Sequence, residues 1–345
     1  MIHTLLVVLA SLALTLPCAE ARSRLKKPRR GFQVRVETYT IAPGEDNEVC
    51  EYRRLPNKKP IEVAGLDLRM PPGAHHFVLW KYGGNLKDGD NPAFDQKFDE
   101  RTIVPRVGCT GAAPDEFLSI NTFGMQTPNS RVLFPKGIAI TFDAYQRVFL
   151  NPHMKNFSTE PLVPDVRFNI LTVPKRRVKH HAESFTVGNM PDINIPAGGF
   201  QRLVSEWTVP QDLNMTQLSS HQHRLGTYTE IQVEQDDGSM APVFQNDDWE
   251  HPRAIWMHKT APWKDRDPQV LTLKKGQKIR FTCEWQNFTA ARVRFGTETT
   301  DEMCFVTGYF WRENEGEPLA GPGCFPNHEG LLCPFAKTVS STTIP

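Results

Sequence analysis

The chain has 345 residues and a formal net charge of +1 at pH 7, with 28 prolines and 23 glycines. This nearly neutral balance gives no general attraction to nucleic acid, so the composition argues against a nucleic-acid-binding protein. The length is comfortable for two domains and too great for one modest β-sandwich.

An apolar leader opens the chain. Residues 1–21, MIHTLLVVLASLALTLPCAEA, contain an apolar run that ends in Ala19-Glu20-Ala21. This length and this small-residue ending are typical of a secretory signal peptide rather than a membrane span. No later apolar run is long enough to cross a bilayer. We therefore expect cleavage after Ala21 and a secreted protein without an integral membrane segment, or a periplasmic one if the source is bacterial.

Strand patterns dominate the remaining sequence. In Ile279–Trp285 apolar and polar residues alternate strictly, and similar runs are QVRVETYTI, GIAITFDAY, VRFNILTV and TYTEIQV. Turns rich in Pro, Gly and Asn separate these runs, and no long amphipathic helix is apparent. The pattern predicts an all-β protein built from antiparallel β-sandwich, jelly-roll-like domains.

A basic, proline-containing connector at residues 173–177 marks the expected domain boundary. We expect an N-terminal β-sandwich over residues 31–173 and a C-terminal one over residues 178–312, each of normal domain size. Beyond Trp311 the composition turns to Glu, Gly and Pro and then to the polar run KTVSSTTIP. Residues 313–345 are therefore expected to form a weakly ordered tail.

Six cysteines remain once the leader is removed with Cys18. They are Cys50, Cys109, Cys283, Cys304, Cys324 and Cys333. An even count in an exported chain predicts three disulfides, although six cysteines allow 15 connectivities. None of them lies in a CxxC pair, so zinc-knuckle and thioredoxin-like classes have no support. Cys324 and Cys333 are expected to close a small loop in the tail.

Two adjacent histidines stand at the start of an apolar run, in PPGAHHFVLW (residues 71–80). Neighbouring side chains on a regular strand point to opposite faces, so His75 and His76 can bind one ion only at a bend or a strand end. The Pro-Pro-Gly turn before them supplies such a bend. With His153 they make a candidate site of three imidazoles. Eleven histidines also make one chance pair unsurprising.

His221 and His223 form a second candidate pair, in HQH. At this spacing two side chains on a strand share one face, which suits two bonds to one metal, although two ordinary polar residues of a half-buried strand would look the same. Met303 precedes an aromatic strand. A methionine there is more often a core residue, but its thioether is a soft ligand that favours Cu(I). Two imidazoles and one thioether would make a copper site able to change oxidation state.

The order of these motifs resembles one enzyme family. GAHHFVLW, an isolated His153, HQHRLG and TTDEMCFVTGYFW follow one another as in the type II copper, ascorbate-dependent monooxygenases, which include the peptidylglycine α-hydroxylating and dopamine β-monooxygenases. The resemblance runs from about Phe32 to Trp311. It implies two β-sandwich domains that face each other across a wet cleft, each holding one copper ion.

The resemblance also implies roles for the ligands. His75, His76 and His153 would hold an electron-storing copper, and the catalytic copper, which meets dioxygen and substrate, would be bound by a second set: His221, His223 and Met303. The cofactors would be two copper ions per chain, with ascorbate or a similar electron donor. Cys283 resembles the family cysteine that pairs with the one after the methionine, here Cys304. Elimination then leaves two pairs, Cys50–Cys109 and Cys324–Cys333.

The departures from the family fall where substrate would bind. Peptidylglycine hydroxylases have Arg two residues before HxH, and Asn and Tyr two and four residues after the copper methionine. These positions, here Ser219, Phe305 and Thr307, form the candidate substrate pocket. The Arg and Tyr that would bind a peptide carboxylate are absent from these positions. The resemblance therefore implies hydroxylation of a C–H bond in another small organic molecule.

Two other functions remain open at this point. One is a non-catalytic copper-binding protein for storage, delivery or sensing on the same fold. The other is a disulfide-stapled adhesion protein whose histidines are incidental. Ascorbate-driven oxygen consumption separates the first of these from a monooxygenase, and copper content separates the second.

Overall fold

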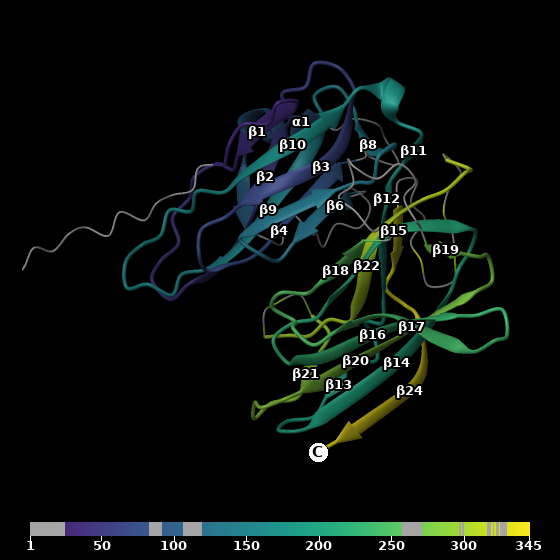
Figure 1. The fold of residues 1–345 in the computed structure, drawn as a ribbon. Coiled ribbons are helices and arrows are strands. Elements are labelled where there is room, and N and C mark those ends of the chain that lie inside the picture. The colour runs from purple at the N-terminus through teal and green to yellow at the C-terminus, as the bar shows by residue number, and fades with distance from the viewer. Residues whose placement is uncertain are drawn as a thin grey trace, which may run out of the picture.

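The structure is a computed structural model that describes residues 25–82, 92–105, 119–256, 271–296, 298, 300–315, 319, 321, 324 and 330–345. The predicted signal peptide and Cys109 lie outside these residues. The described chain is nearly all β, as the alternating pattern predicts, and its strands form two stacked halves (Figure 1). Within the described ranges, no helix has the length and apolar character needed to span a bilayer.

The first half is a sandwich of two sheets. In the six-stranded sheet the order is β1, β10, β3, β8, β11, and β7 also pairs with β3. Its strands are β1 (Gly31–Arg35), β3 (Ile61–Arg69), β7 (Asn129–Leu133), β8 (Ile138–Phe142), β10 (Arg167–Val173) and β11 (His180–His181). The five-stranded sheet, in spatial order, is β5 (Ile103–Pro105), β2 (Asp46–Arg54), β9 (Arg147–Lys155), β4 (Ala74–Tyr82) and β6 (Ser119–Met125).

Alternating apolar residues of these two sheets build the first core. Phe77 of β4 and Phe168 of β10 come from opposite sheets, and their ring centroids lie 5.3 Å apart. Side chains on a strand alternate between its two faces. Each strand can therefore pack one face in this core while the other face lies on the outside of the sandwich. The short helix α1 (Pro92–Glu100) covers part of that outer face, where Phe98 packs on Tyr52 of β2.

The second half repeats the arrangement. Its six-stranded sheet has the order β18, β15, β22, β12, β23, and β19 also pairs with β15. These strands are β12 (Glu183–Gly188), β15 (Leu213–His221), β18 (Ala254–Trp256), β19 (Leu271–Leu273), β22 (Phe305–Trp311) and β23 (Gly330–Cys333). The five-stranded sheet, in spatial order, is β17 (Met240–Asn246), β16 (Gly226–Glu234), β20 (Lys278–Gln286), β14 (Phe200–Thr208) and β24 (Lys337–Ile344). A further two-stranded sheet joins β13 (Asn194–Ile195) to β21 (Val293–Arg294).

The connector and the tail differ from the sequence-based expectation. The basic connector is the exposed 3-10 helix η1 (Lys175–Arg177). Beyond it, β11 pairs in parallel with β8, so the first sheet extends past residue 173. The tail was predicted to be weakly ordered, but its described residues from 330 onward include two strands: β23 pairs with β12, and β24 pairs with β14. The unpaired edges of these sheets supply the hydrogen-bond partners that a polar, weakly patterned tail needs to form strands.

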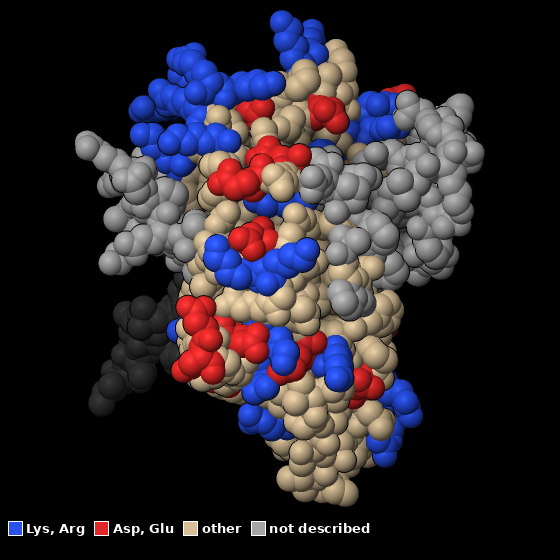
Figure 2. Space-filling view, turned by 90° about the vertical axis from the view of Figure 1, so that its right-hand side faces the viewer, with Lys and Arg blue, Asp and Glu red and all other residues tan. Residues whose placement is uncertain are grey.

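Tyr309 joins the two halves. It lies on β22 of the second sandwich, yet its ring packs in the first core, 5.0 Å from the ring of Phe134. Its hydroxyl donates a hydrogen bond of 3.0 Å to the backbone carbonyl of Thr122. Charges of both signs are mixed over the face shown in Figure 2, and Lys and Arg gather at its upper end, over the first sandwich.

Disulfides tie down two segments of the second half. Cys283 of β20 is bonded to Cys304, as the family resemblance implies, and this bond connects β20 to the segment directly before β22. Cys324 is bonded to Cys333 in the tail, as predicted. Cys50 is also disulfide-bonded, but its predicted partner Cys109 lies outside the described residues.

Candidate metal centre

A β-bulge places the adjacent histidines on one side of the sheet. β4 pairs with β9, and the register shifts between Ala74 and His76, so His75 is the extra residue of the bulge. A bulge breaks the strict alternation of side chains, and both imidazoles can then face the same space. Gly73, the turn residue directly before this strand, has a φ of 86°, and a Cβ there would lie 2.6 Å from the carbonyl oxygen of Lys155. The predicted bend is therefore present, and it needs glycine.

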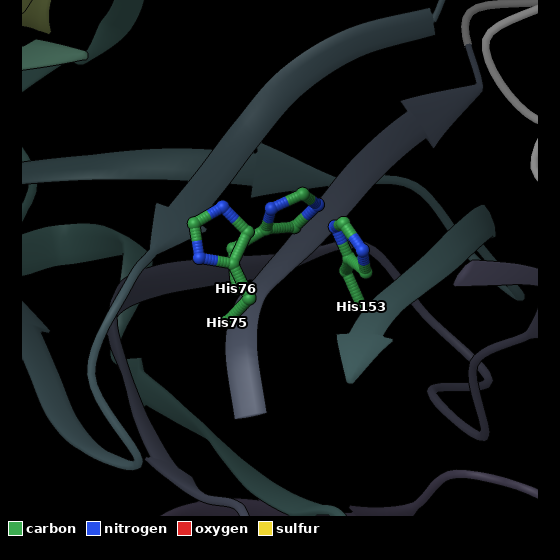
Figure 3. Close-up of side chains that lie close together, drawn as sticks. All are labelled: His75, His76 and His153. Atoms are coloured by element: carbon green, nitrogen blue, oxygen red, sulfur yellow. The ribbon is translucent and has the colours of Figure 1, made fainter. Parts of the chain in front are cut away.

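The three predicted first-site histidines lie together. His76 stands opposite His153 across the β4–β9 pair. The ring centroid of His153 is 5.1 Å from that of His75 and 4.9 Å from that of His76. One ring nitrogen from each residue lies within 4.8 Å of the others, so the three imidazoles can share one ion (Figure 3).

The hydrogen bonds of His153 indicate which nitrogen is available. Nε2 lies 2.6 Å from Oδ1 of Asp46, whereas Nδ1 is buried and has no hydrogen-bond partner. A ligand histidine usually has its other ring nitrogen held by a carboxylate or carbonyl group, which fixes its tautomer and orientation. A buried nitrogen without a partner lowers the stability of the folded state unless its lone pair binds a metal ion or accepts a hydrogen bond. The donor set therefore fits a metal ion.

The second predicted pair is held by hydrogen bonds at the other ring nitrogen, Nδ1. His221 ends β15, and its ring centroid is 5.1 Å from that of His223. Nδ1 of His221 lies 3.2 Å from Oε1 of Gln126, and Nδ1 of His223 lies 3.1 Å from the carbonyl oxygen of Asp301. Both oxygens are acceptors, so each Nδ1 carries the proton and each Nε2 keeps a lone pair for a metal.

Glu302 connects Met303 to this pair. Its buried carboxylate accepts the backbone N–H groups of His223 at 2.9 Å, Leu225 at 2.7 Å and Met303 at 3.2 Å, together with the indole N–H of Trp285 at 2.9 Å. Burial raises the pKa of Glu302 to about 7, although these donors favour the charged form. The half-buried Met303 is thus held beside His223 by one shared carboxylate.

The two histidine sets are close neighbours. The ring centroids of His75 and His223 lie 6.5 Å apart, and that of Trp249 lies 5.9 Å from His75. Burial, with the neighbouring histidines, lowers the pKa of His75 to about 3, and burial lowers that of His223 to about 4. Burial also lowers the pKa values of His76 and His221. These imidazoles are therefore neutral at pH 7, the form that binds metals.

The candidate pocket residues share a face with His221. On the paired strands β15 and β22, Ser219 stands opposite Thr307, and His221 stands opposite Phe305. All four are partly buried, and alternate residues of a strand face the same side. The hydroxyl of Ser219 donates to the carbonyl oxygen of Arg253 at 2.7 Å. The three residues thus form an uncharged patch beside the second pair.

Several residues at this centre were not predicted from the sequence. Asp46 and Glu48 lie on β2, whereas Gln126 and Trp249 lie in loops, and only pairing in three dimensions brings them to the histidines. Glu302 had a visible signal, because it directly precedes Met303 in DEMC. The ionised form of Glu48 is favoured here: burial raises its pKa, but His76 and His153 outweigh burial and hold it at about 2.

No protein-family model matches this chain, and no curated protein matches it either. The resemblance to the copper monooxygenases therefore rests on the motif residues themselves.

Proposed function

We propose that this protein is a secreted copper-dependent monooxygenase that hydroxylates a C–H bond of a small organic substrate, with dioxygen and ascorbate or a similar reductant. The observation that carries the proposal is the pairing of two ligand sets: three imidazoles beside two imidazoles and a methionine segment, with outer partners fixing His153, His221 and His223. The disulfides support an oxidising compartment and hence secretion.

The two ligand sets would have different roles because their ligand types differ. Bound copper would supply the electron transfer and the dioxygen activation. The thioether of Met303 favours the reduced metal, whereas imidazoles serve both oxidation states. Asp46, Gln126 and the Asp301 carbonyl orient the imidazoles, and Glu302 holds the two ligand segments of the second set in register.

The uncharged patch supports a substrate without a carboxylate. Ser219, Phe305 and Thr307 offer hydroxyl groups and an aromatic surface beside His221, but no cation. None of these three side chains could give a carboxylate the charge-assisted hydrogen bonds that normally hold it. A neutral aromatic or aliphatic molecule with few polar groups fits this patch better than a peptide terminus.

One observation favours a second function, a non-catalytic copper-binding protein for storage, delivery or sensing. Trp249 lies against His75 and Gln126 bonds to His221, so side chains from both halves already lie beside the ligands. Such contacts restrict the approach of a substrate, whereas a protein that only binds copper needs no such approach.

Copper content and oxygen uptake test the proposal. Reconstituted protein should bind two copper ions per chain, and ascorbate should drive oxygen consumption that is coupled to product for some member of a panel of neutral aromatic and aliphatic compounds. A His221→Ala/His223→Ala variant should keep one copper and lose the coupled reaction. Two coppers without coupled oxygen uptake would support the binding protein, and well-folded protein without copper would contradict both functions.

A further inference from the structure

Glu48 stands in line with two of the first-site histidines. On β9, His153 is opposite Glu48 of β2 on one side and His76 of β4 on the other. Residues directly opposite one another on neighbouring strands project from the same face of the sheet. One carboxylate and two imidazoles therefore form a row across three adjacent strands, and the side chain of Glu48 is only 10% exposed.

The distances in this row fit metal ligands. Oε2 of Glu48 lies 3.8 Å from Nδ1 of His153, and Oε1 lies 3.5 Å from Nε2 of His76. The 3.8 Å separation from His153 lies beyond the range of an N–H···O hydrogen bond, and the 3.5 Å separation from His76 lies at its outer limit, where a weak hydrogen bond remains. Nitrogen and oxygen ligands bound at about 2 Å to one ion lie roughly 3–3.5 Å apart, close to these separations. The nearer nitrogen on His153 is also the buried one without a hydrogen-bond partner.

Asn151 holds the carboxylate in this position. Its amide nitrogen donates to Oε1 of Glu48 at 3.0 Å and to the carbonyl oxygen of Val49 at 2.9 Å. Asn151 is 1% exposed, so its own conformation is fixed by packing. With Oε1 occupied by the amide, Oε2 is the oxygen that faces Nδ1 of His153.

We propose that Glu48 contributes a carboxylate oxygen to a divalent metal ion at His75, His76 and His153, which makes the first site selective for Cu(II) over Cu(I). Carboxylate oxygen is a hard ligand and adds a negative charge, so it stabilises the divalent ion more than the monovalent one. Met303 acts in the opposite sense at the second set. The inference rests on the proposed function, because it takes copper as the metal of this site.

The test uses a His221→Ala/His223→Ala parent, in which copper can bind only at the first site. Glu48→Gln in this parent should weaken Cu(II) binding by about tenfold or more and leave Cu(I) affinity unchanged. The Cu(II) electron paramagnetic resonance spectrum should change, since an oxygen ligand is lost. Glu48→Asp, which keeps a carboxylate, should restore part of the Cu(II) affinity. Glu160→Gln, an exposed glutamate after β9, is the charge-matched control and should bind as the parent does.

Each other outcome overturns the inference in a different way. Equal losses of Cu(I) and Cu(II) affinity would assign Glu48 to the structure of the site and not to the metal. An unchanged Cu(II) affinity and spectrum would show that the carboxylate does not reach the ion, while the proposed function would stand. A folded parent that binds no copper would overturn the proposed function together with this inference.

Discussion

The indole N–H of Trp285 donates a hydrogen bond of 2.9 Å to the carboxylate of Glu302. Trp285 lies on β20 together with Cys283, which is bonded to Cys304 on the other side of Glu302 and Met303. The segment that carries Met303 is therefore attached to β20 twice, once by a hydrogen bond and once covalently. The two attachments are made by the side chains on either side of the candidate ligand, Glu302 before it and Cys304 after it.

Removal of the Cys283–Cys304 bond should therefore affect both stability and the second site. Cys283→Ala/Cys304→Ala is expected to lose roughly 2–5 kcal/mol of unfolding free energy. It should also weaken Cu(I) binding at the second set, because Met303 is less firmly placed. Denaturant unfolding and copper per chain measure the two effects. Cys324→Ala/Cys333→Ala is the control, since it opens a tail loop; equal loss of second-site copper in the control would refute the link.

Gly73 should be essential for the first site. Its φ of 86° disfavours any side chain by about 1–2 kcal/mol, and a Cβ would also lie 2.6 Å from the carbonyl oxygen of Lys155. Gly44 has a φ of 73° but open space around it, so Gly44→Ala carries the backbone strain alone. Gly73→Ala should thus be less stable than Gly44→Ala and should bind copper more weakly at His75 and His76. Equal unfolding free energies for the two variants would contradict the contact argument.

Mutations in the two ligand sets should impair different steps of the proposed reaction. A His153→Ala protein, once reduced, should still bind carbon monoxide at the second set but turn over poorly with ascorbate. A Met303→Ala protein should lose product formation even when the first copper is reduced, because the thioether favours the reduced metal that meets dioxygen. Met240→Ala, which removes a partly buried methionine of β17, is the control. Wild-type single-turnover yield in Met303→Ala would show that the roles are wrong.

The metal-free protein should lose stability in acid. The pKa values of His75 and His223, about 3 and about 4, lie below their ordinary value of 6.5. Below pH 6.5 the unfolded chain then binds more protons than the folded one. The stability that these neutral histidines contribute to the folded state is therefore fully present above pH 6.5 and is lost as the pH falls toward 4. Glu302 acts in the opposite direction, since its pKa is raised to about 7, but it is one group against four histidines with lowered pKa values.

Thermal melts with a chelator between pH 7 and pH 5 measure this effect. The melting temperature should fall with pH, and it should fall less in His75→Gln, which removes one of the titrating groups. A melting temperature that rises on acidification would mean that Glu302 dominates over the histidines.

The sequence predicts where the strands lie better than it predicts which strands pair with one another. Strict alternation in Ile279–Trp285 is a local signal, and this run lies within β20. The pairing of β11 with β8, and of the tail strand β24 with β14, depends on edges formed by residues far away in the chain, which no local pattern encodes. At the candidate site the histidines stand in recognisable motifs. Glu48 and Asn151 do not, because their importance comes only from standing near His153.

Tyr309 has a consequence for how the chain unfolds. Its ring completes the first core while its backbone is a ladder residue of β22 in the second sandwich. If the second sandwich unfolds, the first core loses the strand that holds the Tyr309 ring in place. If the first sandwich unfolds, the ring of Tyr309 on β22 loses its packing. Such coupling favours one cooperative unfolding transition over two independent ones. The candidate metal ligands of both halves would then be lost together on heating, and partial unfolding would not leave one half able to bind a metal ion alone.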